Sequence, residues 1–422
     1  MSTIITFKHN KSNSVILHIV ALVLIYISGA AITSIDAGAN IGLILNTVIY
    51  VFGLYCMVKE FGNFKIDTKM FTLLCVIIVF GTICTINYVP SVVKVFKRLA
   101  LFIIFFSIAK YIEKKGILFE KYLYDVVLWL AYIALIFFMV INIFRIDLPH
   151  QVLTHGTNTI DTYNNYLYIF FTGSNYFTGN IGGIRFYRLQ GIFWEPGVFA
   201  VYLNLALFYY FFCIEKKKKA HMVILLIDIF LTLSTTGLCV AAVLAGAHMI
   251  ERIRGIQSKL MVFMPITILV AFTVAVIWMK KKNLSDNAWS SYALRTDDLS
   301  NSLKIWKSHF LFGTGFNNTS MFQGTIENRG NSNGLLTWCY TTGLIGAVAI
   351  FYPMIGNIIR YKGKRIICAL FLGTFIVVNM TEPLINSYFM IYLVARVYSI
   401  FLYRNGGRLN GFNKSKNYSY SP

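Results

Sequence analysis

The sequence predicts an all-α membrane protein, a polytopic bundle of about twelve transmembrane helices with two long outer loops. Three observations predict this fold class. The 422 residues are 57% apolar and 13% charged, whereas average soluble domains are about 45–50% apolar and about 25% charged. The mean hydropathy is +0.64. The basic residues collect in the short segments between apolar runs, as in proteins that span a membrane. A soluble enzyme and a disulfide-stapled secreted protein are excluded.

A spanning helix needs roughly 20 predominantly apolar residues, and the chain holds about twelve such ranges, with eleven to thirteen compatible with the pattern. The predicted spans are 15–33, 41–58, 70–87, 92–110, 125–144, 196–214, 220–234, 237–250, 260–279, 334–358, 365–379 and 385–403. The ranges 220–234 and 237–250 are short and are joined by Ser234-Thr-Thr-Gly237. A tight helical hairpin and a re-entrant pair both fit them.

The basic residues predict the orientation of the bundle. With the N-terminus inside, 24 Lys and Arg fall in inner segments and 10 in outer segments, which fits both termini in the cytoplasm. The formal net charge of +21 is therefore explained by orientation in the membrane, and no nucleic-acid partner is expected. The expected organisation is a single transmembrane domain over residues 1–404. A Gly-, Asn- and Ser-rich cytoplasmic tail over 405–422 is expected to be disordered.

Two outer segments, 145–195 and 280–333, are too long to be simple turns, and loops of this length in compact proteins are usually functional or disordered. The second contains a pattern typical of an amphipathic helix. Thr296-Asp-Asp298 supplies an N-cap and early acidic residues, and Gly313 follows its end. Its apolar positions recur at helical spacing at Leu299, Leu303, Trp306 and Phe310. The helix is expected to lie on the membrane surface, with Arg295 just before it.

Charged residues cluster where the first long loop enters a span. Arg185, Arg188 and Glu195 approach the outer surface here, and Pro196 suits the first turn of a helix. The arginines could instead anchor to lipid headgroups, and Glu195 could simply favour the helix N-terminus.

A second basic group lies just inside a span that begins at the outer face. Lys94, Lys97 and Arg98 share one helix face, against the usual distribution of positive charge. Ionisable residues within spans often mark function, although long basic side chains also extend to headgroups. Asp228 is an acid in mid-span and needs a partner, so a structural ion pair is as good an interpretation as a direct role.

These residues suggest an outward-facing basic site for a membrane-bound phosphate or diphosphate. Arginine and lysine can stabilise a leaving group as charge develops on it, and a carboxylate can take a proton from an attacking hydroxyl. The seven cysteines and seven histidines show no zinc spacing and no metal-type cluster. No nucleotide-binding motif is visible either, so no metal and no cofactor are expected.

Four segments in order resemble Wzy-type O-antigen polymerases. They are Arg188-Leu-Gln-Gly-Ile-Phe-Trp-Glu-Pro-Gly197, then Leu233-Ser-Thr-Thr-Gly237, then Arg295 with Trp306 and His309-Phe-Leu-Phe-Gly-Thr-Gly-Phe316, and last Asn331-Ser-Asn-Gly-Leu-Leu336 with Gly343-Leu-Ile-Gly346. Together they are similar to the superfamily that joins O-antigen polymerases and O-antigen ligases. Ligases of this pattern tend to carry His-Asn where this chain has Ser332-Asn333, which favours the polymerase.

The resemblance implies a GT-C-like bundle in the bacterial inner membrane with both termini cytoplasmic and both long loops periplasmic. The implied reaction moves a growing glycan from undecaprenyl diphosphate to a newly flipped lipid-linked repeat unit. The implied partners are these lipid-linked glycans, membrane lipid and a polysaccharide chain-length regulator, with no metal or other cofactor.

The resemblance and the charge pattern together assign roles to seven residues. The expected catalytic residues are Glu195 as base, with Arg188 and Arg295. The expected diphosphate ligands are Lys94, Lys97, Arg98 and Arg185.

Two alternatives stay open. The nearer is a ligase that moves finished glycan to lipid A–core. The other is a lipid-linked oligosaccharide flippase, which would also have about twelve spans but should have short outer loops. Two outer loops of about 50 residues argue against a flippase.

Overall fold

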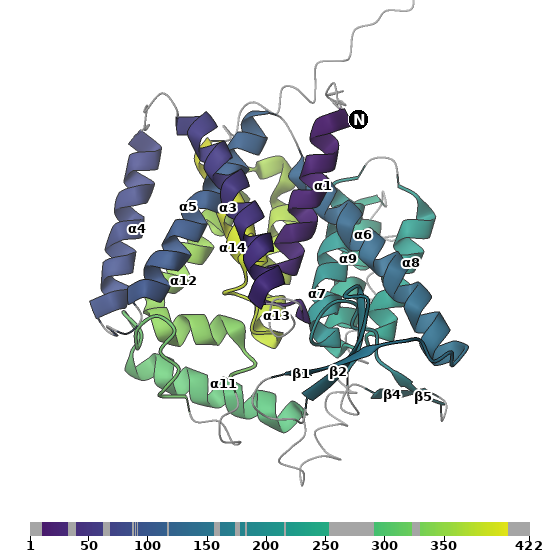
Figure 1. Cartoon of the computed structure of the whole chain (residues 1–422). Helices are drawn as coiled ribbons and strands as arrows, with labels where there is room; N and C mark the ends of the chain where they lie inside the picture. Colours follow the sequence, from purple (N-terminus) through teal and green to yellow (C-terminus); the bar gives the residue numbers. More distant parts are fainter. Residues whose placement is uncertain are drawn as a thin grey trace, which may run out of the picture.

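The structure, a computed structural model, is a mostly helical bundle (Figure 1). It describes residues 11–32, 39–61, 68–86, 88, 90, 92–115, 118–155, 161–173, 178–181, 184–214, 217–252, 291–322 and 330–403. The predicted span at 260–279 and the predicted tail at 405–422 lie outside these residues. Five short strands and helix α11 gather at one end of the bundle, opposite the labelled N-terminus (Figure 1). We call this the α11 end.

Within the described residues, helices occupy eleven of the twelve predicted ranges. They are α1 (Lys11–Tyr26), α3 (Ala39–Phe61), α4 (Thr68–Ile86), α5 (Val92–Lys114), α6 (Phe119–Phe138, continued by a π-turn at Met139–Ile143), α7 (Pro196–Phe212), α8 (Lys219–Leu231), α9 (Thr235–Arg252), α12 (Gly334–Arg360), α13 (Arg365–Thr381) and α14 (Tyr388–Tyr403). By length and composition, three segments can cross a membrane, namely Gly42–Lys59, Phe119–Ile143 and Gly334–Arg360, and several shorter apolar helices accompany them. The architecture is that of a helical membrane protein.

Apolar side chains lie both inside and outside the bundle, which is the pattern expected of helices that face lipid. Helix α7 lies at the centre, with Phe199, Leu203 and Leu207 fully buried. Peripheral helices instead expose large apolar side chains, for example Leu43 on α3 (68% exposed) and Phe71 on α4 (61% exposed). An apolar exterior of this kind is stable only against an apolar environment.

The first long loop folds into strands, which the sequence analysis did not predict. Strands β1 (Gln151–His155), β2 (Asp161–Tyr166) and β3 (Phe170–Gly173) form an antiparallel sheet, and β4 (Thr178–Ile181) pairs with β5 (Ile184–Tyr187). The fold is therefore helical with a small β addition, rather than purely α. The backbone N–H of Phe171 donates to the carbonyl of Gly191 (2.9 Å), so the sheet is joined to the segment that carries the first charged cluster.

The second long loop contains the predicted helix, but its start differs from the prediction. Helix α11 spans Ser291–Ser308, so Arg295 lies within it rather than before it. The segment Thr296-Asp-Asp298 was wrongly taken as the cap, because Asp298 is fully buried in a tertiary contact instead. Leu299 and Leu303 are 37% and 36% exposed, whereas Trp306 packs partly buried against the core, so only part of the expected apolar face is turned outward.

The loop after α11 is fixed by a break in α12. Gly343 has φ 68° and ψ −166° inside α12, a backbone conformation that side chains rarely adopt. The backbone groups released there pair with the loop. The N–H of Thr314 donates to the carbonyl of Tyr340 (2.8 Å), and the N–H of Leu344 donates to the carbonyl of Phe310 (2.8 Å). A side chain on Gly313 would meet the carbonyl of Thr341, so both glycines are needed for this close approach. The glycine motif therefore joins α11 to α12.

Candidate functional site

Four charged residues from distant parts of the chain meet at the α11 end of the bundle. Arg188 and Glu195 come from the segment between β5 and α7, Arg295 from α11, and Glu382 from the turn after α13. The Arg295 Nη2 atom lies 3.6 Å from the Glu382 Oε1 atom. The Arg295 side chain is 38% exposed and the Glu382 side chain 5%, so the site has one solvent-facing guanidinium over a buried acid.

Glu195 lies at the N-cap position of α7, with extended backbone at φ −140° and ψ 141°. Its carboxylate makes no capping hydrogen bond, and Pro196 occupies the first turn as predicted. Helix capping therefore does not account for this acid. Burial raises the pKa of Glu195, while the nearby Arg295 and Arg188 lower that pKa.

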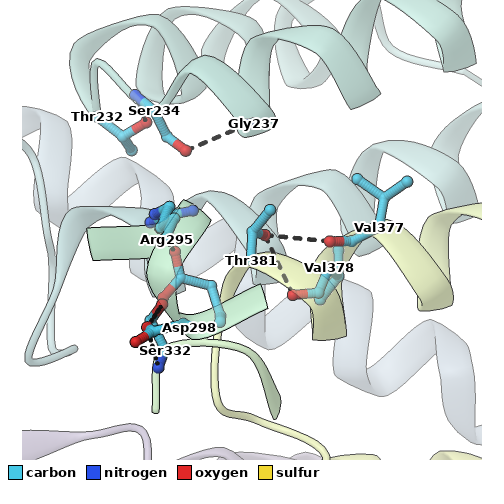
Figure 2. A network of polar contacts seen from close by, with 10 residues as sticks. Thr232, Ser234, Gly237, Arg295, Asp298, Ser332, Val377, Val378 and Thr381 are labelled. Carbon is cyan, nitrogen blue, oxygen red and sulfur yellow. Dashed lines mark hydrogen bonds and ion pairs between the residues drawn. The ribbon is translucent and has the colours of Figure 1, made fainter. Parts of the chain in front are cut away.

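Arg188 is held by the turn between α8 and α9. Its Nε atom donates to the carbonyl of Thr232 (2.8 Å). In the same turn the N–H of Gly237 donates to Ser234 Oγ (3.1 Å), which caps α9. Figure 2 shows this turn near Arg295 and Thr381. Burial lowers the pKa of Arg188, and the carboxylates of Glu195 and Glu382 raise it. Because this Nε contact fixes the orientation of the guanidinium, its remaining N–H groups are held in place to bind an anion.

Glu382 was missed by the sequence analysis. Its pKa lies well above the usual range, because burial and the neighbouring Glu195 raise it more than Arg295 and Arg188 lower it. The absent side chain of Gly197 leaves the space that the Glu382 carboxylate occupies. A side chain on Gly334 would lie 2.8 Å from the Glu382 carbonyl. One signal was present in the sequence. Glu195-Pro196 and Glu382-Pro383 are the same dipeptide, each beside an apolar run.

The segment around Ser332 has a structural role here. Ser332 donates from its backbone N–H (2.9 Å) and from its Oγ (2.5 Å) to Asp298 Oδ2, as Figure 2 shows. Asn333 caps α12 by accepting from the N–H of Leu336 (2.9 Å). Arg295 forms its ion pair with Glu382, while Asp298 ties α11 to the start of α12.

The predicted basic group on α5 is divided by the fold. Lys94 and Lys97 are exposed, whereas Arg98 is partly buried, with its guanidinium 5.4 Å from the centre of the Tyr388 ring. Within the described residues, the Arg98 Nη1 atom is buried and has no hydrogen-bond partner.

Arg98 lines a partly open pocket between α4, α5, α12 and α14, whose walls are otherwise mainly apolar. Ile385 and Asn386, in the turn that carries Glu382, line it as well. The pocket therefore reaches the turn that also carries Glu382.

Two other predicted residues stand apart. The backbone of Arg185 lies in β5 opposite Asn180, and its side chain lies outside the described residues. Asp228 is fully buried in α8. Among the described residues its carboxylate oxygens have no hydrogen-bond or ion-pair partner, so the expected structural ion pair is not found there. Across all the residues that the structure describes, no group of three His, Cys, Asp or Glu side chains is placed to hold a metal ion.

The fold and the site together describe a helical membrane protein whose buried charged cluster can bind an anion and accept a proton. The sequence model of the O-antigen ligase family matches residues 220–351, which include α8, α9, α11 and most of α12. This match supports the superfamily of O-antigen ligases and polymerases and is compatible with either activity. No curated protein gives a significant match.

Proposed function

We propose that the protein is an O-antigen polymerase of the bacterial inner membrane. It transfers a growing glycan from undecaprenyl diphosphate to a lipid-linked repeat unit, with the α11 end in the periplasm and both termini in the cytoplasm. The observation that carries this proposal is the convergence of Arg188, Arg295 and Glu195 at one end of the bundle, within electrostatic reach of each other.

The chemistry follows from the positions of these groups. The guanidinium of Arg295 faces solvent and, with Arg188, binds the diphosphate and stabilises the charge that develops as it leaves. The Glu195 carboxylate accepts the proton of the acceptor hydroxyl. The hydroxyl oxygen bonds to the anomeric carbon, and the bond from that carbon to the diphosphate oxygen breaks with its electron pair. Undecaprenyl diphosphate leaves.

The apolar pocket supports a lipid-linked substrate. An elongated hydrocarbon chain is stabilised by burial in apolar surroundings, at about 0.8 kcal/mol for each CH₂ group. The pocket reaches the turn of Glu382, so a chain bound there would present its diphosphate towards the arginines. Arg98 is the basic residue of the α5 group in position to contribute, and Lys94 and Lys97 lie on the exposed surface.

A specific observation favours polymerase over ligase. Ser332 occupies the position where ligases of this pattern tend to carry histidine, and its hydroxyl is engaged by Asp298. The acids that this site offers are then Glu195 and the more buried Glu382. The ligase remains the second candidate, because the family match itself is to O-antigen ligases.

The proposal is tested by deleting the gene and resolving the surface polysaccharide on a gel. Loss of the ladder to core plus one repeat unit supports the polymerase. Complete loss of attached glycan identifies a ligase, and accumulation of lipid-linked repeats on the inner leaflet identifies a flippase. Complementation with the intact gene, but not with an Arg188→Ala variant, connects the ladder to this site.

A further inference from the structure

The cluster contains two acids, and the proposed reaction uses only one of them. Glu382 is more buried than Glu195, since its residue is 3% exposed and Glu195 is partly exposed. The two carboxyl groups interact electrostatically with each other and with both arginines. Two acids that interact in one site titrate as a pair rather than independently.

The fold builds a place for this second acid. Gly197, in the first turn of α7, lacks the side-chain atom that would collide with the Glu382 carboxylate. On another side, Gly334 at the start of α12 allows the backbone of Glu382 to approach closely. Arg295 of α11 supplies the ion pair. The acid is therefore enclosed by the starts of two helices and by a guanidinium, from three separate parts of the chain.

We propose that Glu195 and Glu382 hold one proton between them in the ligand-free protein, and that Glu382 is the positioning residue that carries this proton while Glu195 acts as the base. This inference rests on the proposed function for its use in catalysis, but the sharing of the proton can be measured without substrate.

The charge balance of the site explains the arrangement. With both acids ionised, the two glutamates and two arginines are neutral together and attract a diphosphate weakly. With one proton on the acids, the cluster carries a net positive charge. Two buried like charges in one site also oppose each other, so the second ionisation is unfavourable. One retained proton therefore leaves both a cation for the anion to bind and a carboxylate to act as base.

Proton transfer in the proposed reaction balances with this arrangement. The acceptor hydroxyl gives its proton to the ionised carboxylate as the new bond forms at the anomeric carbon, and the diphosphate leaves with the electron pair of the broken bond. The acids then hold two protons, and one returns to solvent as the products leave. The bound diphosphate competes with Glu382 for Arg295. Loss of this ion pair favours the protonated form of Glu382, so that Glu195 keeps the ionised carboxylate.

The experiment is an infrared pH titration of the purified, ligand-free protein in lipid nanodiscs, which follows the carbonyl stretch of protonated carboxylic acids. Asp228→Asn serves as the background, because Asp228 is a buried acid outside the site. We expect a protonated band that persists above the ordinary range of glutamate, about pH 4–5, and that is lost from this range in Glu382→Gln and in Glu195→Gln alike. A band that is unchanged in either variant would overturn the inference.

A second measurement tests the consequence for catalysis. Glycan transfer by the wild type should fall at low pH, where a second proton binds and Glu195 is no longer a base, and at high pH, where both acids ionise and the net positive charge of the cluster is lost. Glu382→Gln mimics the neutral, protonated Glu382, so the acidic limb should stay near its wild-type position and the alkaline limb should disappear. Glu382→Asp keeps an ionisable group and should retain both limbs. A purely structural role would lower the rate equally at every pH in both variants and would contradict the proposal.

The two hypotheses fail separately. If the wild type transfers glycan but the infrared band of the protonated acid is the same in both variants as in the wild type, proton sharing is wrong and the proposed function stands. If the band behaves as expected but no lipid-linked repeat is polymerised, the function is wrong and the proton-sharing pair stands.

Discussion

Glu195 stands at a helix N-terminus without capping it, which separates its chemical role from its structural one. We predict that Glu195→Gln loses glycan transfer by about 10²–10⁴-fold, because the amide cannot accept the proton of the acceptor hydroxyl. Thermal stability in detergent should stay near the wild-type value, since no capping hydrogen bond is removed. Rates are measured with purified protein and lipid-linked repeats. Asp147→Asn is the control, because Asp147 is an exposed acid of the same loop. A near wild-type rate for Glu195→Gln would restrict Glu195 to a helix-terminus role.

Arg295 combines solvent exposure with an ion pair, so it can exchange Glu382 for an anionic ligand. A guanidinium binds phosphate oxygens through two parallel hydrogen bonds, which lysine cannot reproduce. We therefore predict that Arg295→Lys loses at least about tenfold in rate and that Arg295→Ala loses about 10²–10³-fold. Expression and membrane insertion should not change.

The control for Arg295 is Lys304→Ala, an exposed cation on the same helix. A full-length polysaccharide ladder from the Arg295→Lys strain would mean that charge alone suffices at this position. The diphosphate contact would then be no more than electrostatic.

At the residue scale, the sequence indicated part of the site. Arg188, Glu195 and Arg295 were selected from local patterns, and the fold brings them together, although their chemical roles remain predictions. Glu382 lies far along the chain from all three, and only the packing of α7, α11 and α12 places it among them. The fold separates Arg98 from Lys94 and Lys97 by burial, which the sequence did not predict, because helical spacing gives a shared face but does not say how much of it is covered.

At the element scale, hydropathy predicted the helices because each apolar run is long enough to be helical in lipid. It gave no information on the β-strands of the first loop, where β2 reads Asp161-Thr-Tyr-Asn-Asn-Tyr166 with little apolar alternation. These strands are fixed by tertiary contacts, such as the hydrogen bond from Phe171 to Gly191. The predicted start of α11 was wrong for a related reason. An aspartate side chain can belong to a helix N-terminus or to a buried tertiary contact, and the sequence pattern does not distinguish the two.

The break in α12 yields a prediction for an element. Gly343 has positive φ, and a side chain there would collide with the carbonyl of Leu311. Gly343→Ala should lose about 1–3 kcal/mol from backbone strain alone. It should also displace the 309–316 loop and with it Arg295, so both the melting temperature and the transfer rate should fall.

The matched control is Gly373→Ala in α13, where the added methyl group meets nothing within 4 Å. An alanine in a helix interior is favoured over glycine by roughly 0.5–1 kcal/mol, so this variant should be at least as stable as the wild type. Equal melting temperatures for the two variants would show that the α12 break is not needed to hold the loop.

At the scale of the whole molecule, charge and shape agree on an orientation. The strands and α11 lie at one end of the bundle, and the N-terminus is at the other (Figure 1). The segments assigned to the N-terminal side contain 24 basic residues against 10 on the α11 side, and positive residues accumulate on the cytoplasmic side. Leu299 and Leu303 of α11 are exposed apolar side chains, as in a helix at a membrane surface.

This orientation predicts which residues an impermeant thiol reagent can reach. In a variant whose seven native cysteines are replaced, single cysteines are introduced at Ser300 on α11 and at Lys218 before α8, both exposed positions. In intact spheroplasts we expect labelling at position 300 and protection at position 218, because the membrane separates the two. Permeabilisation should expose position 218 without changing position 300. Protection of position 300, or labelling of position 218 before permeabilisation, would place the charged cluster on the cytoplasmic side, where a periplasmic glycan polymerase cannot work.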